Sequence, residues 1–276
     1  MYITSFYYRM VLQNFVNERL KITSNTKSAT LQPTTKDELR LLIEKEVERQ
    51  GDLVDLNHID TSLITDMSDL FNDTERDVEL HIRNIKIDQW DVSNVTDMSW
   101  MFFGCDKFLG TGAGFENWDT SKVTKTYAMF DGCYRFNGTG LDSWDVSNVT
   151  NMSSMFYDCK NFEGVGLGKW DVSNVKNMMS MFHNCKNFEG TGLENWNTSN
   201  VTNMEDMFMS CENLDTDLSK WDVSNVKNIS MMFYGCRKIR CNLSHWDLSK
   251  IHKDSKKKVF YGCDNQPQRF RPKIKN

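Results

Sequence analysis

The stretch that decides the fold is Trp144-Asp145-Val146-Ser147-Asn148-Val149-Thr150-Asn151-Met152-Ser153-Ser154-Met155-Phe156-Tyr157-Asp158-Cys159. Its opening is a Trp followed by Asp or Asn, with a Ser three positions after the Trp. This opening recurs at Trp90, Trp118, Trp144, Trp170, Trp196, Trp221 and Trp246. The copies are 25 to 28 residues apart, and in the first six a Cys follows the Trp by 15 positions. A fixed period of this length indicates a solenoid or another repeat array.

Within one copy the apolar pattern changes its period. Residues 144–147 alternate between apolar and polar, which predicts a short strand. The apolar residues that follow have the spacing of one helical face: Met152, Met155, Phe156 and Cys159. We therefore expect an α/β repeat solenoid in which each coil contributes a short parallel strand and a short helical segment.

The rest of the chain divides around this array. We expect residues 1–32 to form an N-terminal helix and a polar linker, and residues 33–58 to form an α-helical cap. Residues 59–263 then form a solenoid of about eight repeats, and residues 264–276 form a basic, disordered tail. Thr35 and Glu38 make a capping box at the start of the cap, and Gly51 supplies its end. A solenoid needs such a cap because its terminal coil has one unpaired apolar face.

Charge is distributed unevenly along the chain. The net charge is −5, but the residues from Lys250 onward include nine Lys or Arg and two Asp, so these residues carry +7 and the rest of the chain carries −12. The basic tail could contact nucleic acid, although we expect a solubilising end and no nucleic-acid partner. No apolar run approaches the ~20 residues of a membrane span. The start of the chain does not resemble a secretory signal, so the sequence alone predicts a cytoplasmic protein.

Acidic residues recur directly after the Trp in nearly every copy. They are Asp91, Asp119, Asp145, Asp171, Asp222 and Asp247, and the series is interrupted only by Asn197. One interpretation is a hydrogen bond from each side chain to the backbone N–H two residues later. The other is a row of calcium sites. Asn197 can form the same hydrogen bond, which favours the first interpretation. No metal ligand set, cofactor site or catalytic motif is predicted.

A residue type that every copy keeps is expected to serve the fold, so recognition is expected where the copies differ. The residues just before each Trp differ most, and they adjoin the Asp series on the predicted strand face. We call this predicted partner-binding surface the acidic face. It consists of Asp88, Asp91, Glu116, Asp119, Asp142, Asp145, Lys169, Asp171, Glu194, Asn195, Lys220, Asp222, His245 and Asp247. Its carboxylates predict a protein partner with a polar or basic surface.

The motif Leu-x-x-Trp-Asp-Val-Ser-Asn-Val-Thr-x-Met-x-x-Met-Phe-x-x-Cys resembles the repeat of the BspA-like leucine-rich-repeat surface proteins, known also from mycoplasma lipoproteins. Residues 36–39 and 59–67 resemble the entry segment of that family. The resemblance extends over residues 33–263. It implies a leucine-rich-repeat-like solenoid, a location at the cell surface and a role in binding or adhesion. It brings no catalytic residues.

These observations predict a non-enzymatic, monomeric scaffold for protein–protein interaction or adhesion that presents the acidic face to its partner. The alternative is a structural or assembly protein whose repeats associate with one another. Neither function requires a cofactor.

Overall fold

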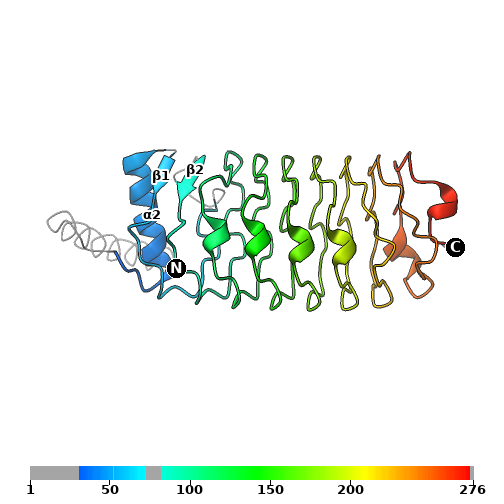
Figure 1. Cartoon of the computed structure of the whole chain (residues 1–276), viewed down its shortest axis with the longest axis horizontal. Coiled ribbons are helices and arrows are strands. Elements are labelled where there is room, and N and C mark those ends of the chain that lie inside the picture. The colour runs from blue at the N-terminus through cyan, green and yellow to red at the C-terminus, as the bar shows by residue number, and fades with distance from the viewer. Residues whose placement is uncertain (1–30, 52, 73–81, 274–276) are drawn as a thin grey trace, which may run out of the picture.

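The computed structural model describes residues 31–51, 53–72 and 82–273. The repeats stack into one elongated solenoid, with helix α2 (Lys36–Gln50) at one end and the C-terminus at the other (Figure 1). We call each repeat a coil and number it by its Trp, or by Ile59 in the first copy. The helix expected in residues 1–21 lies outside the described residues. The repeat solenoid predicted from the sequence is confirmed.

Helix α2 begins and ends at the residues that the sequence marks. The Thr35 hydroxyl accepts a hydrogen bond from the Glu38 backbone N–H at 3.2 Å, and the Glu38 carboxylate accepts one from the Thr34 N–H at 2.7 Å. At the other end Gly51 has a φ of 76° and donates its N–H to the Val47 carbonyl at 2.8 Å. The buried side chains of α2 are Leu39, Leu41, Leu42, Ile43 and Glu46. The helix thereby shields the apolar end of the array from water.

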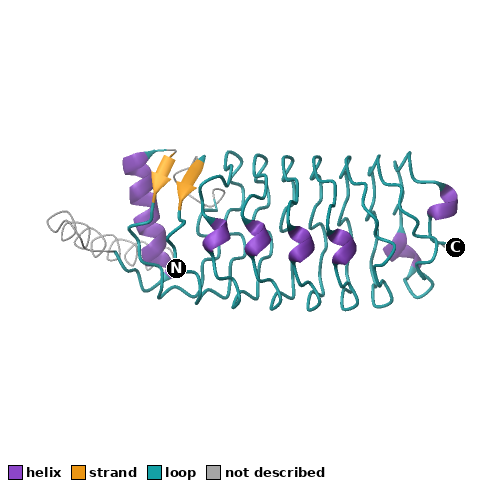
Figure 2. Cartoon of the chain, in the orientation of Figure 1, coloured by secondary structure: helices purple, strands orange, loops and turns teal. Residues whose placement is uncertain are grey.

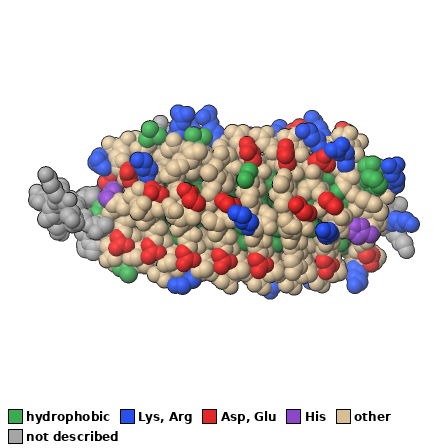
Figure 3. All heavy atoms as spheres, in the orientation of Figure 1, with side chains coloured by type: hydrophobic (Ala, Val, Ile, Leu, Met, Phe, Trp, Pro, Cys, Tyr) green, Lys and Arg blue, Asp and Glu red, His purple; other side chains and the backbone are tan. Residues whose placement is uncertain are grey.

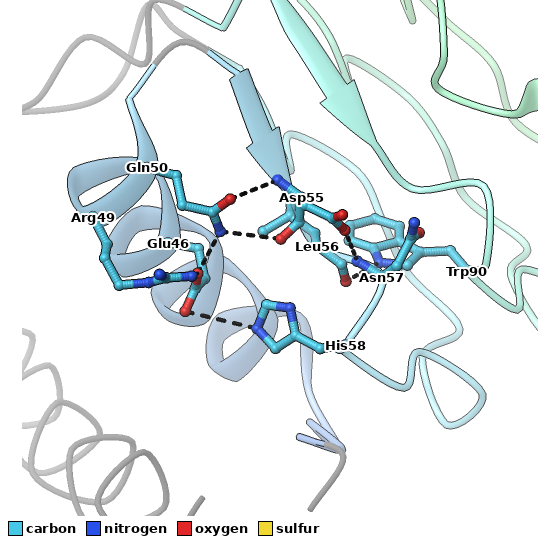
Figure 4. A network of polar contacts seen from close by, with 8 residues as sticks. All are labelled: Glu46, Arg49, Gln50, Asp55, Leu56, Asn57, His58 and Trp90. Atoms are coloured by element: carbon cyan, nitrogen blue, oxygen red, sulfur yellow. Dashed lines mark hydrogen bonds and ion pairs between the residues drawn. The ribbon is translucent and has the colours of Figure 1, made fainter. Parts of the chain in front are cut away.

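The Glu46 carboxylate connects α2 to the first coil (Figure 4). Glu46 is only 6 % exposed. It accepts hydrogen bonds from Arg49 at 2.5 Å and Gln50 at 2.6 Å, and the His58 ring lies 3.7 Å from it. Gln50 also exchanges two hydrogen bonds with the backbone of Asp55, at 3.0 and 3.1 Å. Because a buried carboxylate without partners is costly, these contacts fix the helix against the array.

Regular strand pairing is confined to the first coils among the described residues. Strand β1 (Leu53–Asp55) pairs in parallel with β2 (Asn84–Lys86), and Val54 lies opposite Ile85 (Figure 2). Single parallel bridges join the later coils. They run through Asp66, Asp97, Lys125, Asn151, Asn177, Asn203 and Asn228.

The strand predicted at residues 144–147 is wrong. The Val149 N–H donates to the Val146 carbonyl at 2.9 Å, which closes a turn at Ser147 and Asn148. The backbone therefore changes direction before it can pair with a neighbouring coil. The alternation of apolar and polar residues is real, but it belongs to a short extended segment that leads into this turn.

The helical segment predicted at residues 152–159 is also wrong, because a run of turns occupies this position. The N–H groups of Met155, Tyr157 and Cys159 each bond to the carbonyl three residues earlier, at 3.0 to 3.2 Å. The intervening N–H groups, those of residues 152, 154, 156 and 158, donate to coil 170 at 2.8 to 2.9 Å. We call the segment equivalent to residues 152–158 in each coil the turn ladder.

Two features exclude an α-helix from the turn ladder. Every second N–H leaves the coil, so it cannot bond to the carbonyl four residues earlier. Ser154 and Asp158 also have positive φ, at 56° and 58°, which a right-handed helix does not allow. Successive three-residue turns still direct the apolar side chains inward, and this produces the spacing that resembles a helical face.

The true helical turns lie just before the Trp in four coils. These 3-10 helices are Phe115–Asn117, Leu141–Ser143, Leu167–Lys169 and Leu193–Asn195 (Figure 2). Each follows a Gly with left-handed φ, such as Gly140 at 87°. In the two 25-residue copies no such Gly occurs, and the Asp217 and Asn242 side chains instead accept the N–H two residues later. A side-chain turn thus accommodates the missing residue.

The end of the chain differs from the disordered tail that the sequence predicts. Two further 3-10 helices, Lys253–Lys256 and Gln268–Phe270, lie in and after the last coil. The Phe270 carbonyl accepts the Leu243 N–H at 2.8 Å, and the Arg271 guanidinium donates to the Cys263 carbonyl at 3.0 Å. Residues 264–273 therefore fold back on the last coils.

The core consists of columns of identical side chains, one member from each coil. The Trp144 indole N–H donates to the Phe115 carbonyl of the preceding coil at 2.9 Å, and the Cys159 thiol donates to the Phe130 carbonyl, also at 2.9 Å. All eight cysteines are free thiols. Burial raises the pKa of the Cys133 thiol, which keeps it protonated as a donor. The residue types that recur in every copy therefore serve the stacking of coils.

Candidate functional site

The Asp series of the acidic face is held by side-chain turns. The Asp145 carboxylate accepts the backbone N–H of Ser147 at 2.9 Å. Equivalent contacts of 2.8 to 3.1 Å occur at Asp91, Asp119, Asp171, Asn197, Asp222 and Asp247. Because Asn197 forms the same bond, the contact requires an oxygen acceptor and not a charge. Among the described residues, no group of three His, Cys, Asp or Glu side chains is placed to hold a metal ion.

These carboxylates are nevertheless exposed and charged. Hydrogen bonds from the hydroxyl and the backbone N–H of Ser121 lower the pKa of Asp119. Ser173 lowers the pKa of Asp171 in the same way. The series therefore forms a line of negative charge along the solenoid, and Figure 3 shows Asp and Glu side chains recurring along the length of the molecule. The field of such a line extends beyond the surface and attracts positively charged partners.

The variable residues of the acidic face lie in the 3-10 helices or turns that precede each Trp. Several of them bond within the protein. Lys169 pairs with Asp142 of the preceding coil at 2.8 Å, and Glu194 accepts the N–H of Gly192 at 2.9 Å. The side chains of Glu116, Asn195 and Lys220 are exposed. The variable part of this surface is thus partly neutralised by its own lysines.

A second variable surface was not predicted from the sequence. It consists of the turn-ladder side chains at positions 9, 10, 13 and 14 after the Trp in coils 90 to 221, which flank the inward Met and Phe, and we call it the turn face. At position 13 the coils carry Phe103, Asp131, Tyr157, His183, Met209 and Tyr234, all of them half-buried. Positions 11 and 12 are Met and Phe in each of these coils. The Met-Phe pair at positions 11 and 12 does not change between these coils, whereas position 13 changes its chemical type. This contrast in the sequence could have revealed the turn face.

The turn face combines aromatic rings with polar groups that have no partner. The Tyr157 and His183 rings lie 4.4 Å apart, and Trp100 packs edge-on against Tyr127 at 4.8 Å. The Nδ1 atom of His183 and the Oδ1 atom of Asp206 are buried and have no hydrogen-bond partner within the described part of the chain. Burial lowers the pKa of His183, against the opposing charge of Asp158, and favours the neutral ring.

Asp131 is the most perturbed carboxyl of the turn face. Burial raises its pKa to about 7, and the nearby Asp158 carboxylate acts in the same direction. An unfolded Asp titrates near pH 3.9, so the folded protein binds an extra proton between about pH 4 and pH 7. Stability must fall as the pH rises through this window, because the folded state binds more protons than the unfolded state.

Asp131→Asn is expected to remove this pH dependence. The variant should be more stable than the parent by about 1–2 kcal/mol near pH 8, a value reduced for solvent screening, and nearly equal to it near pH 4. Urea unfolding followed by Trp fluorescence across this range measures the difference. Asp158→Asn keeps the burial of Asp131, so it should retain the pH dependence with a lower midpoint. Parallel stability curves for parent and Asp131→Asn would contradict the assignment.

Comparison with known proteins identifies the family to which the chain belongs. No helix in the described residues has the length and apolarity that crossing a membrane requires. No curated protein and no solved structure matches the chain. One family model matches twice, over residues 65–165 and 159–271, which together contain most of the stacked coils. The mycoplasma-type repeat predicted from the motif is thereby confirmed, and the chain belongs to the family described as "Mycoplasma protein of unknown function, DUF285".

Proposed function

We propose that this chain is a non-enzymatic scaffold that recognises a protein partner through its turn face. The observation that carries the proposal is the unused bonding capacity of that face. His183 Nδ1 and Asp206 Oδ1 are buried without a hydrogen-bond partner among the described residues, at positions where the coils differ in residue type. Buried polar groups normally have partners, so a ligand that displaces the side chains covering these atoms and bonds to them would gain free energy that the fold leaves unused.

The aromatic side chains of the turn face suit the same role. Trp100 is 38 % exposed and packs on Tyr127, while Tyr157 lies against His183. Trp and Tyr are enriched among the residues that dominate binding energy at interfaces. A solenoid presents such residues on one extended, rigid surface, which lowers the entropic cost of binding.

The acidic face contributes electrostatic attraction in this proposal. The body of the chain carries a net charge of −12 before its basic end. Exposed carboxylates increase the rate at which a basic partner arrives and contribute less to how long it stays. We therefore propose a partner with a basic surface, attracted by the acidic face and recognised by the turn face.

The repeat motif also supports a proposal about the narrower family of the chain and its location. We infer a BspA-like leucine-rich-repeat protein with an adhesive role at the cell surface. The repeated Trp-Asp-Val-Ser motif and the mycoplasma-type family support this inference.

The alternative function is assembly through end-to-end association of coils. Such assembly needs both ends of the array to be open, whereas α2 lies beside the first strands at the N-terminal end (Figure 1). This favours partner binding. Light scattering over a range of concentrations should therefore give the mass of one chain, and growth of the mass with concentration would support assembly instead.

Two sets of variants separate recognition from electrostatic attraction. A protein captured from the native host is measured against the parent chain and both sets. The double change Tyr157→Ala with His183→Ala should weaken binding by at least about tenfold at every salt concentration. The triple change of Glu116, Asp142 and Glu194 to Lys should slow association by about tenfold at low salt, and this effect should vanish at high salt.

Val165→Ala is the control for both sets, because Val165 is 70 % exposed and belongs to neither face. It should leave capture unchanged. The fold of the double turn-face variant is verified by circular dichroism. If this variant captures the partner as well as the parent chain does, the turn face does not recognise the partner.

A further inference from the structure

The turn ladder donates its inter-coil hydrogen bonds in one direction only, toward the C-terminal end. In the last stacked pair, the N–H groups of Met231, Phe233 and Gly235 donate to coil 246 at 2.8 to 3.0 Å. The N–H groups that alternate with them close turns within their own coil. The C-terminal edge of the ladder therefore presents a row of donors.

Among the described residues no turn ladder stacks on that of coil 246, and the equivalent backbone donors of coil 246 are unused. Within the described residues, the backbone N–H groups of Lys258, Phe260 and Gly262 form no hydrogen bond. These three residues line an open groove of about 690 Å³, together with Gln268 and Arg271. Unpaired backbone donors at alternate residues are the feature by which a sheet edge captures an extended segment of another chain.

The groove also contains cationic side chains that lack a counter-charge. Lys256 is 8 % exposed, and its ammonium donates to the Leu248 carbonyl at 3.2 Å. The Arg271 guanidinium donates to the carbonyls of Cys263 and Gln266, both at 3.0 Å, and its Nε is buried without a partner in the part of the chain that the structure describes. All of these acceptors are neutral.

No carboxylate among the described residues forms an ion pair with Lys256 or Arg271, although Asp264 lies in the same groove. A buried charge without an opposite charge is costly. An anionic group bound in the groove would lower this cost, and the exposed ammonium of Lys258 would add to the attraction.

From these observations we propose that the C-terminal edge of the turn ladder binds an extended acidic segment of a partner protein, which adds to the array as a further strand. The carbonyl groups of the segment accept the N–H groups of Lys258, Phe260 and Gly262. Its carboxylates pair with Lys256, Lys258 and Arg271. This site lies at the end of the solenoid and is separate from the turn face.

Two other occupants fit the edge less well. A second copy of the chain cannot pair here with the same edge, because donors would face donors. Its N-terminal end is covered by α2 (Figure 1). A nucleic acid or polyphosphate would match the charge, but it lacks the regular backbone carbonyls that three aligned N–H groups require.

The test uses the full chain and an end-blocked hexapeptide in which Glu and Val alternate. Titration followed by amide hydrogen exchange should show slower exchange at the N–H groups of Lys258, Phe260 and Gly262. Lys258→Glu should weaken peptide binding by at least about tenfold. Lys107→Glu makes the same charge change on an exposed residue of a distant coil and should leave binding unchanged.

A second variant distinguishes a weaker binding site from an unfolded protein. Lys258 has a φ of 54°, which Gly adopts without strain, so Lys258→Gly should keep the fold. Because it removes the ammonium group, it should also weaken peptide binding. Saturating peptide that leaves the three amides exchanging at their original rates would overturn the proposal. If the chain binds polyuridylate and does not bind the peptide, the proposal is also overturned, and the groove is a site for polyanions.

Discussion

Replacing Phe156 with Ala is expected to lower the free energy of unfolding by about 3–5 kcal/mol. The ring is fully buried and stacks between Phe130 and Phe182, each with a centroid distance of 5.7 Å, and on Phe162 at 4.1 Å. Coils contact only their neighbours, so a cavity in a central coil weakens both halves of the array at once. Urea unfolding followed by Trp fluorescence measures the loss, which is large against a typical total of about 5–15 kcal/mol.

The matched control is Phe260→Ala in the last coil. Phe260 is 8 % exposed and has one Phe neighbour in the column, Phe233 at 5.5 Å. Phe260→Ala should lower the free energy of unfolding by less than half as much as Phe156→Ala does. One stacking partner is missing at Phe260, and the cavity left there can collapse toward solvent. Equal losses at the two positions would show that the stacked column is not what holds the coils together.

Gly166→Ala is expected to cost about 2–5 kcal/mol. A Cβ at this position would lie 2.1 Å from the Asp142 Cβ of the preceding coil, and Gly166 has a φ of 86°. The left-handed conformation costs an Ala about 1–2 kcal/mol, and separation of the two coils adds about 1–3 kcal/mol. Thermal and urea unfolding should both show the change.

Gly112→Ala separates these two contributions. Gly112 has a φ of 78°, but a Cβ there would meet nothing within 4 Å. This variant should cost only the conformational part, about 1–2 kcal/mol. If both variants lost the same stability, the close approach of coils at Gly166 would not matter.

Features that depend on local chemistry or on repetition could be predicted from the sequence. The period identified a solenoid, and the capping box at Thr35 and Glu38 marked the start of α2 correctly. The Asx bond at Asp145 could be inferred because Asn197 replaces Asp at an equivalent position. Each of these inferences needs only a few adjacent residues or a comparison between copies.

The backbone of one coil could not be predicted in this way. Overlapping turns bury Met152, Met155 and Phe156 at the same spacing as a helix, so periodicity alone does not distinguish the two. The deciding feature is the positive φ at Ser154 and Asp158, and it is stabilised by hydrogen bonds to the next coil. Hydrogen bonds between coils cannot be predicted from the residues of a single coil.

The candidate sites were predictable in part, for a related reason. The acidic face rests on exposed residues beside the Trp, which the repeat pattern locates directly. The turn face was assigned to a helix, so the variation at Tyr157 and His183 was not recognised as a surface. The unused donors of Lys258, Phe260 and Gly262 follow only from the direction of inter-coil bonding, which requires the three-dimensional structure.

Site-specific photo-crosslinking in the native host tests the central claim most directly, namely that the turn face recognises a protein partner. A photoreactive amino acid is placed at Tyr157 on the turn face and, in a separate chain, at Val165, which is 70 % exposed and lies outside both faces. We predict one discrete adduct with a second protein from position 157 and none from position 165. The absence of an adduct at 157, the same adduct from both positions, or an adduct with a second copy of this chain would contradict the claim.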